Sequence, residues 1–180
     1  MTNQMNSAKE RLRLAVRDIL DFPKPGVIFK DISPVIEDGQ LFRLAITVFA
    51  EHYKRKNIEQ IVAIDARGFL FGSALAYVLG TGIAVVRKQG KLPHKTIAAT
   101  YDLEYGSNTV EMHVDAVKPG RRVLIVDDVL ATGGTARAAV NLVKQLGGEV
   151  VEVAFLMELG FLRGREKLLP TPCFSVIQYE

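Results

Sequence analysis

Residues 123–135 read Val-Leu-Ile-Val-Asp-Asp-Val-Leu-Ala-Thr-Gly-Gly-Thr, and this stretch decides the fold of the chain. Its first four residues are apolar and mostly β-branched, which is typical of a strand that is buried on both faces of a parallel sheet. Two carboxylates follow, then a loop of small residues, and then a helix-like run over 136–146. A strand that leads through a glycine turn into a helix presents backbone N–H groups to an anion. The loop is therefore expected to hold a phosphate.

The residue types of the loop and of the acid pair specify the ligand further. Gly133 and Gly134 permit a positive φ and a close approach of the backbone, and the threonines beside them add hydroxyl donors. Asp127 and Asp128 repel phosphate oxygens, so we expect them to face hydroxyl groups or a metal ion. A phosphorylated sugar satisfies both halves, with its phosphate in the loop and its diol on the acids. The alternative is an ordinary strand, turn and helix with surface aspartates.

Two common phosphate-binding patterns do not fit this stretch. The Walker motif requires Gly-Lys-Ser or Gly-Lys-Thr after the loop, whereas residues 134–136 read Gly-Thr-Ala. The dinucleotide fingerprint requires three glycines in the spacing G-x-G-x-x-G, which is absent here. The sequence therefore excludes both motifs.

Length and composition suit a single soluble domain. The 180 residues are 48% hydrophobic and 24% charged, and no apolar run approaches the roughly 18 residues of a membrane-spanning helix. The polar N-terminus predicts no secretory signal, and the single cysteine, Cys173, excludes an internal disulfide. The net charge is +3, but the basic residues are scattered, which argues against a nucleic-acid partner. We expect a cytoplasmic protein with no membrane partner.

The rest of the chain alternates between helical and extended patterns. Periodicity predicts helices over 7–20, 40–53, 69–79, 136–146 and 164–168, and strands over 27–32, 61–64, 83–86, 123–126, 150–156 and 173–179. This alternation favours right-handed βαβ units and a parallel sheet. In such a sheet, ligands bind beyond the carboxyl ends of the strands.

Basic side chains follow two of the predicted strands. Arg67 comes after the strand 61–64, and Arg87, Lys88 and Lys91 come after the strand 83–86. We expect them to lie on the same rim as the acid pair. Cations with a divalent metal would suit a doubly charged leaving group such as pyrophosphate. Mg²⁺ would bridge the pyrophosphate and the ribose hydroxyls and keep most of its waters, with no direct protein cage.

Residues 92–114 show a different pattern. Two extended runs, 96–101 and 109–113, flank a polar, glycine-bearing stretch and predict a hairpin. Loss of pyrophosphate leaves an oxocarbenium-like sugar, from which water must be excluded. A mobile lid formed by this hairpin, with Glu104 and Tyr105 near its tip, would exclude it. A surface hairpin without such a role is the alternative.

Taken together, these segments resemble a known family. The stretch 123–135 resembles the phosphoribosyl-pyrophosphate signature of the type I phosphoribosyltransferases, and segments 22–34, 65–69, 87–93, 103–106 and 164–168 resemble the adenine-specific members. The resemblance extends from about residue 21 to residue 180. It implies an α/β fold of the type I phosphoribosyltransferases, with a central, mostly parallel sheet flanked by helices. It also implies one domain over 1–180, with a small hood at about 21–35 and a mobile β-hairpin lid at about 92–114.

The resemblance also assigns roles to residues. The 5-phosphate would lie on Ala131, Thr132, Gly133, Gly134 and Thr135, and the ribose hydroxyls on Asp127 and Asp128. Pyrophosphate would contact Arg67, Arg87, Lys88, Lys91 and Tyr105, in relatives often across a dimer interface. Adenine would stack on Phe29 and against Leu159, with backbone groups of Ile28 and Lys30 reading its edge.

Further implications concern catalysis and backbone geometry. Glu104 would handle the proton of the purine imidazole, and Asp127, Asp128 and Arg67 would complete the catalytic set. The Asp65–Ala66 peptide would be cis. The family more often has arginine where Lys30 stands, so base recognition depends on whether that contact uses the main chain.

The expected activity is that of a purine-salvage glycosyltransferase. Adenine and phosphoribosyl pyrophosphate would give AMP and pyrophosphate, with Mg²⁺, in a cytoplasmic homodimer. One alternative is the same reaction on a 6-oxopurine; residues 157–160 offer no lysine for the purine oxygen, and their carboxylate would repel it. A second alternative is a non-catalytic regulator that senses phosphoribosyl pyrophosphate. The acid pair is the decisive feature, because the hypothesis fails if Asp127 and Asp128 turn away from the loop.

Overall fold

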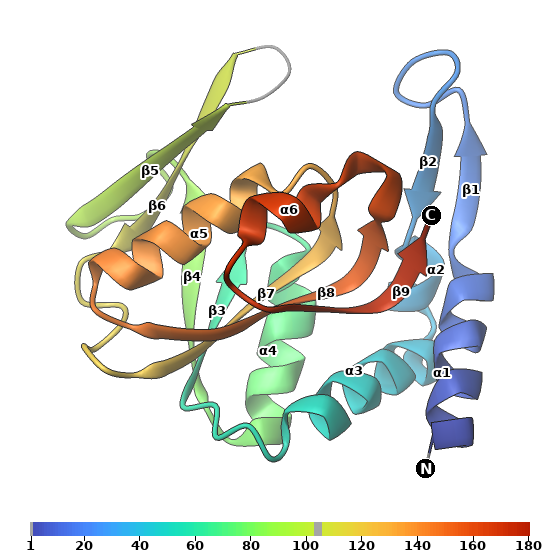
Figure 1. Ribbon diagram of the computed structural model, residues 1–180, viewed down its shortest axis with the longest axis horizontal. Helices are drawn as coiled ribbons and strands as arrows, with labels where there is room; N and C mark the ends of the chain where they lie inside the picture. The colour runs from blue at the N-terminus through green and yellow to red at the C-terminus, as the bar shows by residue number, and fades with distance from the viewer. Residues whose placement is uncertain (1, 103–105) are drawn as a thin grey trace.

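The computed structural model describes residues 2–102 and 106–180 (Figure 1). Its helices are α1 (Thr2–Ala15), α2 (Ser33–Glu37), α3 (Gly39–Tyr53), α4 (Gly68–Leu79), α5 (Gly134–Gln145), α6 (Gly164–Leu168) and the 3-10 turn η1 (Gly160–Leu162). Its strands are β1 (Arg17–Leu20), β2 (Ile28–Asp31), β3 (Gln60–Ile64), β4 (Gly82–Lys88), β5 (Thr96–Asp102), β6 (Ser107–His113), β7 (Arg122–Leu130), β8 (Glu149–Leu159) and β9 (Cys173–Tyr179).

The main sheet is mostly parallel, as the sequence predicted. In the described part of the chain its strand order is β5-β6-β4-β3-β7-β8-β9. Strands β4, β3, β7, β8 and β9 run parallel to their neighbours, and the β5–β6 hairpin joins antiparallel at the edge of β4. All five parallel strands therefore end at the same edge of the sheet, where ligands bind in folds of this kind.

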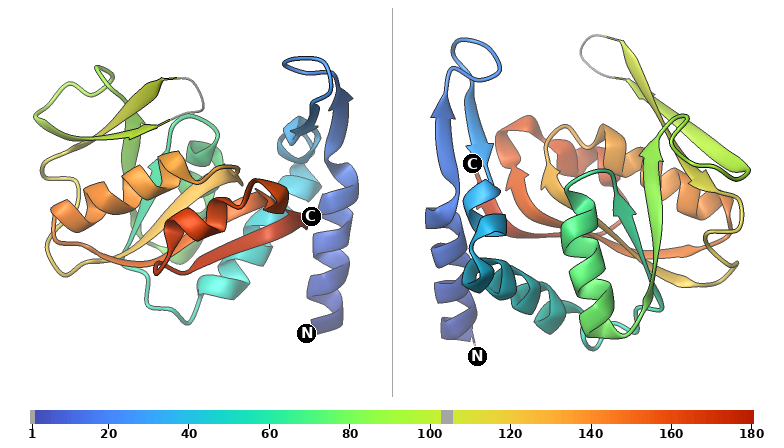
Figure 2. Two further views of the ribbon diagram at one scale, coloured as in Figure 1. Left: turned by 45° about the horizontal axis from the view of Figure 1, so that its top comes forward. Right: turned by 180° about the vertical axis from the view of Figure 1, so that it is seen from behind.

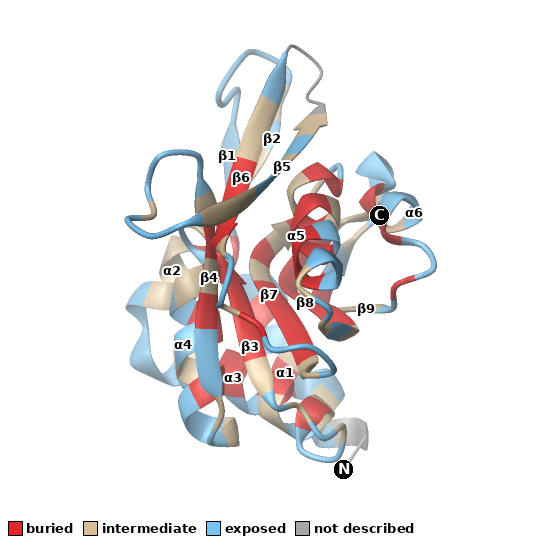
Figure 3. Ribbon diagram, turned by 90° about the vertical axis from the view of Figure 1, so that its left-hand side faces the viewer, coloured by how far each residue is buried: buried red, intermediate tan, exposed pale blue. Residues whose placement is uncertain are grey.

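Strand β7 is buried on both faces because its side chains alternate between two hydrophobic cores. Leu124 and Val126 pack in the core that α1, α3 and α4 share, whereas Val123 and Ile125 pack in the core formed with α5. All four have no exposed surface. Figure 3 shows β7 and the neighbouring β3 as largely buried ribbons, and Figure 2 shows α5 and α4 on opposite faces of the sheet. Each such side chain contributes roughly 1.5–3 kcal/mol to folding, which fixes the position of the acids that follow.

The predicted helix over 7–20 was wrong at its C-terminal end. Helix α1 ends at Ala15, and residues 17–20 form β1, which pairs antiparallel with β2. Ion pairs across this ladder stabilise it, with Arg17 Nη2 2.6 Å from an Asp31 oxygen and Lys30 Nζ 2.7 Å from an Asp18 oxygen. A pairing between residues 14 positions apart thus overrides a local helical pattern. Figure 1 shows the β1–β2 hairpin beside the carboxyl end of β9.

Two strands extend beyond the apolar runs of sequence from which they were predicted. Strand β7 continues through Asp127 and Asp128 to Leu130, and β8 continues through Met157 to Leu159, because both pair in register over these residues. The acid pair therefore lies on a rigid strand and not on a loop. Only the loop 131–133 separates β7 from α5.

The predicted hairpin at the opposite edge is confirmed. Strands β5 and β6 pair from Thr96–His113 to Asp102–Ser107. Glu104 and Tyr105 lie outside the described residues, and the mobility of the lid stays a prediction. No helix within the described ranges is long and apolar enough to cross a membrane.

Candidate functional site

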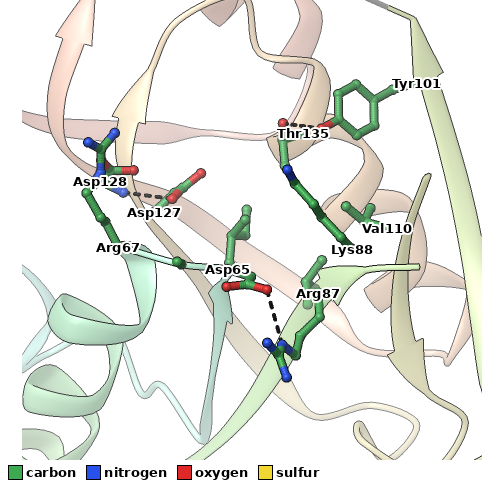
Figure 4. Close-up of a pocket in the computed structure, with 12 residues that line it drawn as sticks. Asp65, Arg67, Arg87, Lys88, Tyr101, Val110, Asp127, Asp128 and Thr135 are labelled. Carbon is green, nitrogen blue, oxygen red and sulfur yellow. Dashed lines mark hydrogen bonds and ion pairs between the residues drawn. The ribbon is translucent and has the colours of Figure 1, made fainter. Parts of the chain in front are cut away.

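A cavity of about 450 Å³ lies at the carboxyl ends of the central strands (Figure 4). Strand ends and the segments that follow them supply its walls. Its charged and polar lining comprises Asp65, Arg67, Arg87, Lys88, Tyr101, Asp127, Asp128 and Thr135. Positions up to 70 residues apart in the sequence thus meet at one edge because their strands are parallel neighbours.

The predicted phosphate loop forms a second, smaller pocket beside this cavity. Its volume is about 70 Å³, and it is lined by Asp127 and by residues 129–136. Gly133 has φ +78° and immediately precedes α5, so the loop turns into the N-terminus of that helix. Asp127 and Thr135 line both the cavity and the pocket. Asp127 thus adjoins the loop, as the sequence predicted, and Asp128 lines the cavity beside it.

The loop is packed backbone to backbone against the start of α6. A Cβ on Gly133 would overlap the carbonyl group of Gly164, and a Cβ on Gly164 would overlap the carbonyl oxygen of Ala131 and lie 2.9 Å from the nitrogen of Gly133. Glycine is therefore required at both positions for this close approach. Arg165, the next residue, holds α6 in place through a two-pronged ion pair with Glu158 of β8.

The two aspartates face the ligand-sized spaces and not the interior. Asp127 lines the cavity and the loop pocket, and its Oδ1 accepts a 2.9 Å hydrogen bond from the backbone N–H of Asp128. Asp128 is 7% exposed and lies 2.5 Å from Nε of Arg67. Burial raises the pKa of Asp127 well above its ordinary value, and the adjacent Asp128 charge raises it further. The charged form of Asp127 is therefore disfavoured at this position.

The predicted cations meet at this cavity with one exception. Arg67 pairs with Asp128, and Nε of Arg87 lies 3.1 Å from Asp65 while its Nη1 donates to the carbonyl of Lys91 at 3.3 Å. Lys88 lines the same wall. Lys91 is exposed and does not belong to the described residues that line the cavity. The Asp65–Ala66 peptide is cis, as the resemblance implied.

A third, largely apolar cavity of about 780 Å³ lies between the β1–β2 hairpin and the carboxyl ends of β8 and β9. Its lining includes the four residues predicted to bind the base, Ile28, Phe29, Lys30 and Leu159. Phe22 contacts Phe29 edge-on, with ring centroids 5.2 Å apart. Arg67 and Asp128 line this cavity as well as the charged one, so the two spaces adjoin.

Sequence reasoning missed several residues of this cavity. Val129, Met157, Phe161, Leu162 and Tyr179 also line it. The signal for Phe161 was its aromatic side chain in a turn after a buried strand, where 58% of its surface is exposed. Exposed apolar residues beside a pocket commonly mark a binding surface.

Two expectations about individual side chains are resolved by their contacts. Lys30 Nζ lies 2.7 Å from Asp18 and 4.5 Å from the centre of the Tyr179 ring, so its charge is held within the hairpin region. The expectation that the carboxylate at 157–160 faces the base was wrong. Glu158 accepts hydrogen bonds from Arg165, Ser175 and Gln178, because alternate residues of β8 point to opposite faces.

Comparisons with known proteins agree with this geometry. The family model described as a phosphoribosyl transferase domain matches residues 36–179. The adenine phosphoribosyltransferase of Methylacidiphilum infernorum is 53% identical over 179 residues, which are 99% of this chain and 100% of the relative.

Solved structures are similar over nearly their whole length. For the adenine phosphoribosyltransferase of Thermoanaerobacter pseudethanolicus the TM-score is 0.92 with 48% identity, covering 95% of this chain and 99% of that one. For the Saccharomyces cerevisiae enzyme, complexed with D-2,5-dideoxy-2,5-imino-altritol 1,6-bisphosphate and adenine, the values are 0.90 and 43%, with coverage of 95% and 99%.

Replacing Gly164 by alanine should disrupt the phosphate loop from behind. The added methyl group would force the Ala131 carbonyl and the Gly133 nitrogen to move, at a cost of about 1–3 kcal/mol in the free energy of unfolding. We expect the affinity for ribose 5-phosphate, measured by calorimetry, to fall at least about tenfold, since about 1.4 kcal/mol of lost binding corresponds to a factor of ten. Gly39→Ala is the matched control, because nothing lies within 4 Å of a Cβ there. Unchanged affinity in Gly164→Ala would contradict the proposed contact.

Replacing Asp127 by asparagine should stabilise the protein in the absence of substrate. The folded state raises the pKa of Asp127 above its ordinary value of 3.8. Binding of the proton therefore stabilises the folded state fully below pH 3.8, and this contribution is lost as the pH rises through the raised pKa. The variant should exceed the wild type in free energy of unfolding by about 1–2 kcal/mol at pH 8. Urea denaturation from pH 4 to 8 measures the difference, which should shrink toward pH 4. The exposed Asp115→Asn serves as control, and a difference that does not vary with pH would refute the assignment.

Proposed function

The chain belongs to the phosphoribosyltransferase family, among the adenine phosphoribosyltransferases of purine salvage, and we propose that three adjoining spaces divide its two substrates between them. The observation that carries this proposal is the sharing of wall residues. Asp127 and Thr135 are common to the loop pocket and the charged cavity, and Arg67 and Asp128 are common to the charged and apolar cavities. One ligand with a phosphate, a diol and a second charged group matches the first two, and a flat base matches the third.

Phosphoribosyl pyrophosphate lies across the acid pair in this proposal. The 5-phosphate accepts hydrogen bonds from the backbone N–H groups of residues 131–135 and from the hydroxyl of Thr132, because the Thr135 hydroxyl donates to Tyr101. The ribose hydroxyls donate to Asp127 and Asp128, which lie on β7 shortly before it ends at Leu130. The support is the position of these oxygens between the loop pocket and the apolar cavity.

The leaving group lies among the cations. Arg67, Arg87 and Lys88 bind pyrophosphate, and Lys91 and Tyr105 complete its binding from the rim. Before substrate binds, Arg67 is paired with Asp128 and Arg87 with Asp65. Pyrophosphate therefore replaces the carboxylates as the partner of both arginines, and Asp128, released from Arg67, accepts hydrogen bonds from the sugar diol.

The donor set fits a Mg²⁺ ion that arrives with the substrate. Oδ2 of Asp128 is buried and accepts no hydrogen bond, although Arg67 Nε is 2.5 Å away. No group of three or more His, Cys, Asp or Glu side chains suited to a metal occurs in the described ranges. Mg²⁺ with most of its waters retained is consistent with such a sparse set. When bound, it neutralises the charge that develops on the leaving pyrophosphate.

Adenine occupies the apolar cavity. It stacks on Phe29 and against Leu159, and the backbone groups of Ile28 and Lys30 read its edge. The engagement of the Lys30 side chain with Asp18 supports a main-chain contact, so lysine serves here as well as the arginine of many relatives. The side chains of β8 that face this cavity, Met157 and Leu159, give a 6-oxopurine no cation for its oxygen.

Bond breaking at the sugar carbon is promoted by charge. As pyrophosphate leaves, the sugar becomes oxocarbenium-like, and the carboxylates of Asp127 and Asp128 stabilise the positive charge. Glu104 handles the proton of the purine imidazole, and a lid over 92–114 excludes water. The enzyme acts as a homodimer in the cytoplasm.

A panel of bases tests the proposed function. With phosphoribosyl pyrophosphate and Mg²⁺ under one set of conditions, pyrophosphate should be released at least about 100-fold faster with adenine than with hypoxanthine or guanine. The reason is that adenine carries no 6-oxo group that would be left without a hydrogen-bond partner in the apolar cavity. Faster release with a 6-oxopurine would overturn the base assignment. Binding without release with every base would favour a phosphoribosyl-pyrophosphate sensor instead.

Replacing Asp128 by alanine should abolish most of the activity while the fold persists. The variant loses both the diol contact and the stabilisation of the cationic sugar, so we expect kcat/KM to fall by at least about 100-fold. The freed Arg67 has a half-exposed side chain, so the free energy of unfolding should change by less than about 1 kcal/mol. Steady-state kinetics and circular dichroism measure both quantities, with the exposed Asp115→Ala as control. Near-normal turnover would rule out the assignment of the acid pair.

A further inference from the structure

We infer that Tyr101 is a further ligand-binding residue, whose phenol hydroxyl donates a hydrogen bond to the phosphate ester held by residues 131–135. The inference rests on the proposed function for the identity of that ester, ribose 5-phosphate within phosphoribosyl pyrophosphate. Tyr101 belongs to β5, at the opposite edge of the sheet from the base cavity.

The hydroxyl of Tyr101 is hydrogen-bonded to a residue of the phosphate-binding segment 131–135. Oγ1 of Thr135 donates to the phenol oxygen at 2.9 Å, as Figure 4 shows. Since Thr135 has only one hydroxyl proton and Tyr101 accepts it, the phenol proton is left to donate elsewhere. Both residues line the charged cavity, and Thr135 also lines the loop pocket. The free phenol proton therefore lies at the junction where the phosphate end of a sugar would pass.

The ring of Tyr101 fixes the position of this hydroxyl. A Cβ on Gly134 would lie 2.8 Å from Cδ2 of the ring and 3.4 Å from Cε2, so the ring rests on the bare backbone of the loop. A glycine at 134 thus serves the approach of Tyr101 as well as that of a phosphate. The contact holds the hydroxyl beside the loop at little additional entropic cost on binding.

Successive side chains of β5 point to opposite faces of the sheet, and this alternation directs the Tyr101 side chain toward the loop. Ile97, Ala99 and Tyr101 all face the core that includes α5, and Tyr101 ends this row. Its ladder partner is Asn108 of β6. The phenol ring continues a hydrophobic face, while its hydroxyl extends past that face to Thr135. A tyrosine that served only as packing would need no hydroxyl at this position, which makes the hydroxyl the group to test.

The test removes the hydroxyl and keeps the ring. In Tyr101→Phe, the affinity of the full chain for ribose 5-phosphate, measured by calorimetry, should fall about tenfold, as expected for a lost hydrogen bond to a charged group. Affinity for pyrophosphate and KM for adenine should stay within about twofold, because those groups lie on the other residues of the site. Thr100→Val is the matched control, since it removes a hydroxyl one position earlier that bonds only to Thr109 in the described hairpin.

Two results would overturn the inference. Unchanged affinity for ribose 5-phosphate in Tyr101→Phe would show that the hydroxyl does not contact the ester. An equal loss of affinity for ribose 5-phosphate and pyrophosphate, with a lowered melting temperature, would show a role in packing alone. The proposed function is tested separately, by the turnover of adenine in the wild type. If the wild type did not turn over adenine, a selective loss of ribose 5-phosphate binding in Tyr101→Phe would still support the role of the hydroxyl.

Discussion

Parallel pairing of β7 with β3 and β8 is the constraint on which the rest of the molecule depends. The pairing buries both faces of β7, and its apolar residues alternate between the two cores. Since a register shift by one residue would exchange the faces, the register is strongly determined. It follows that Asp127 and Asp128 lie at one defined position along β7, beside the carboxyl end of the neighbouring β3. The charged groups that follow β3 and those that end β4 are placed by the pairing of β3 with β7 and with β4.

The site that results is electrostatically balanced before any ligand binds. Acids and cations occur in pairs, Arg67 with Asp128 and Arg87 with Asp65. In the proposed function, both arginines would leave these carboxylates to bind pyrophosphate, and Asp128 would bind the sugar hydroxyls. Asp127 is the exception, because burial beside Asp128 raises its pKa. The ionised carboxylate of Asp127 thus lowers the stability of the fold, and in the proposed function that carboxylate binds the sugar.

Close backbone packing fixes the phosphate loop on two sides. Gly164 approaches from α6, and the Tyr101 ring approaches from β5. Arg165 and Glu158 hold α6 against β8, so an ion pair outside the cavities determines the shape of the loop. The shape of the loop therefore depends on residues that lie about 30 positions before and after it in the chain.

The sequence by itself determined the parallel strands, the acid pair, the phosphate loop and the hairpin at 96–113, because each depends on a short pattern of burial or turn chemistry. Through resemblance to a family, it also indicated that Ile28 to Lys30 and Leu159 lie together, and these residues do line one cavity. Only the tertiary structure decided that residues 17–20 form a strand, since their partner is β2 and their ion pairs cross the ladder. It likewise turned Glu158 away from the apolar cavity and brought Tyr101 to Thr135. These contacts join distant segments, and a local pattern holds no information about which segments become neighbours.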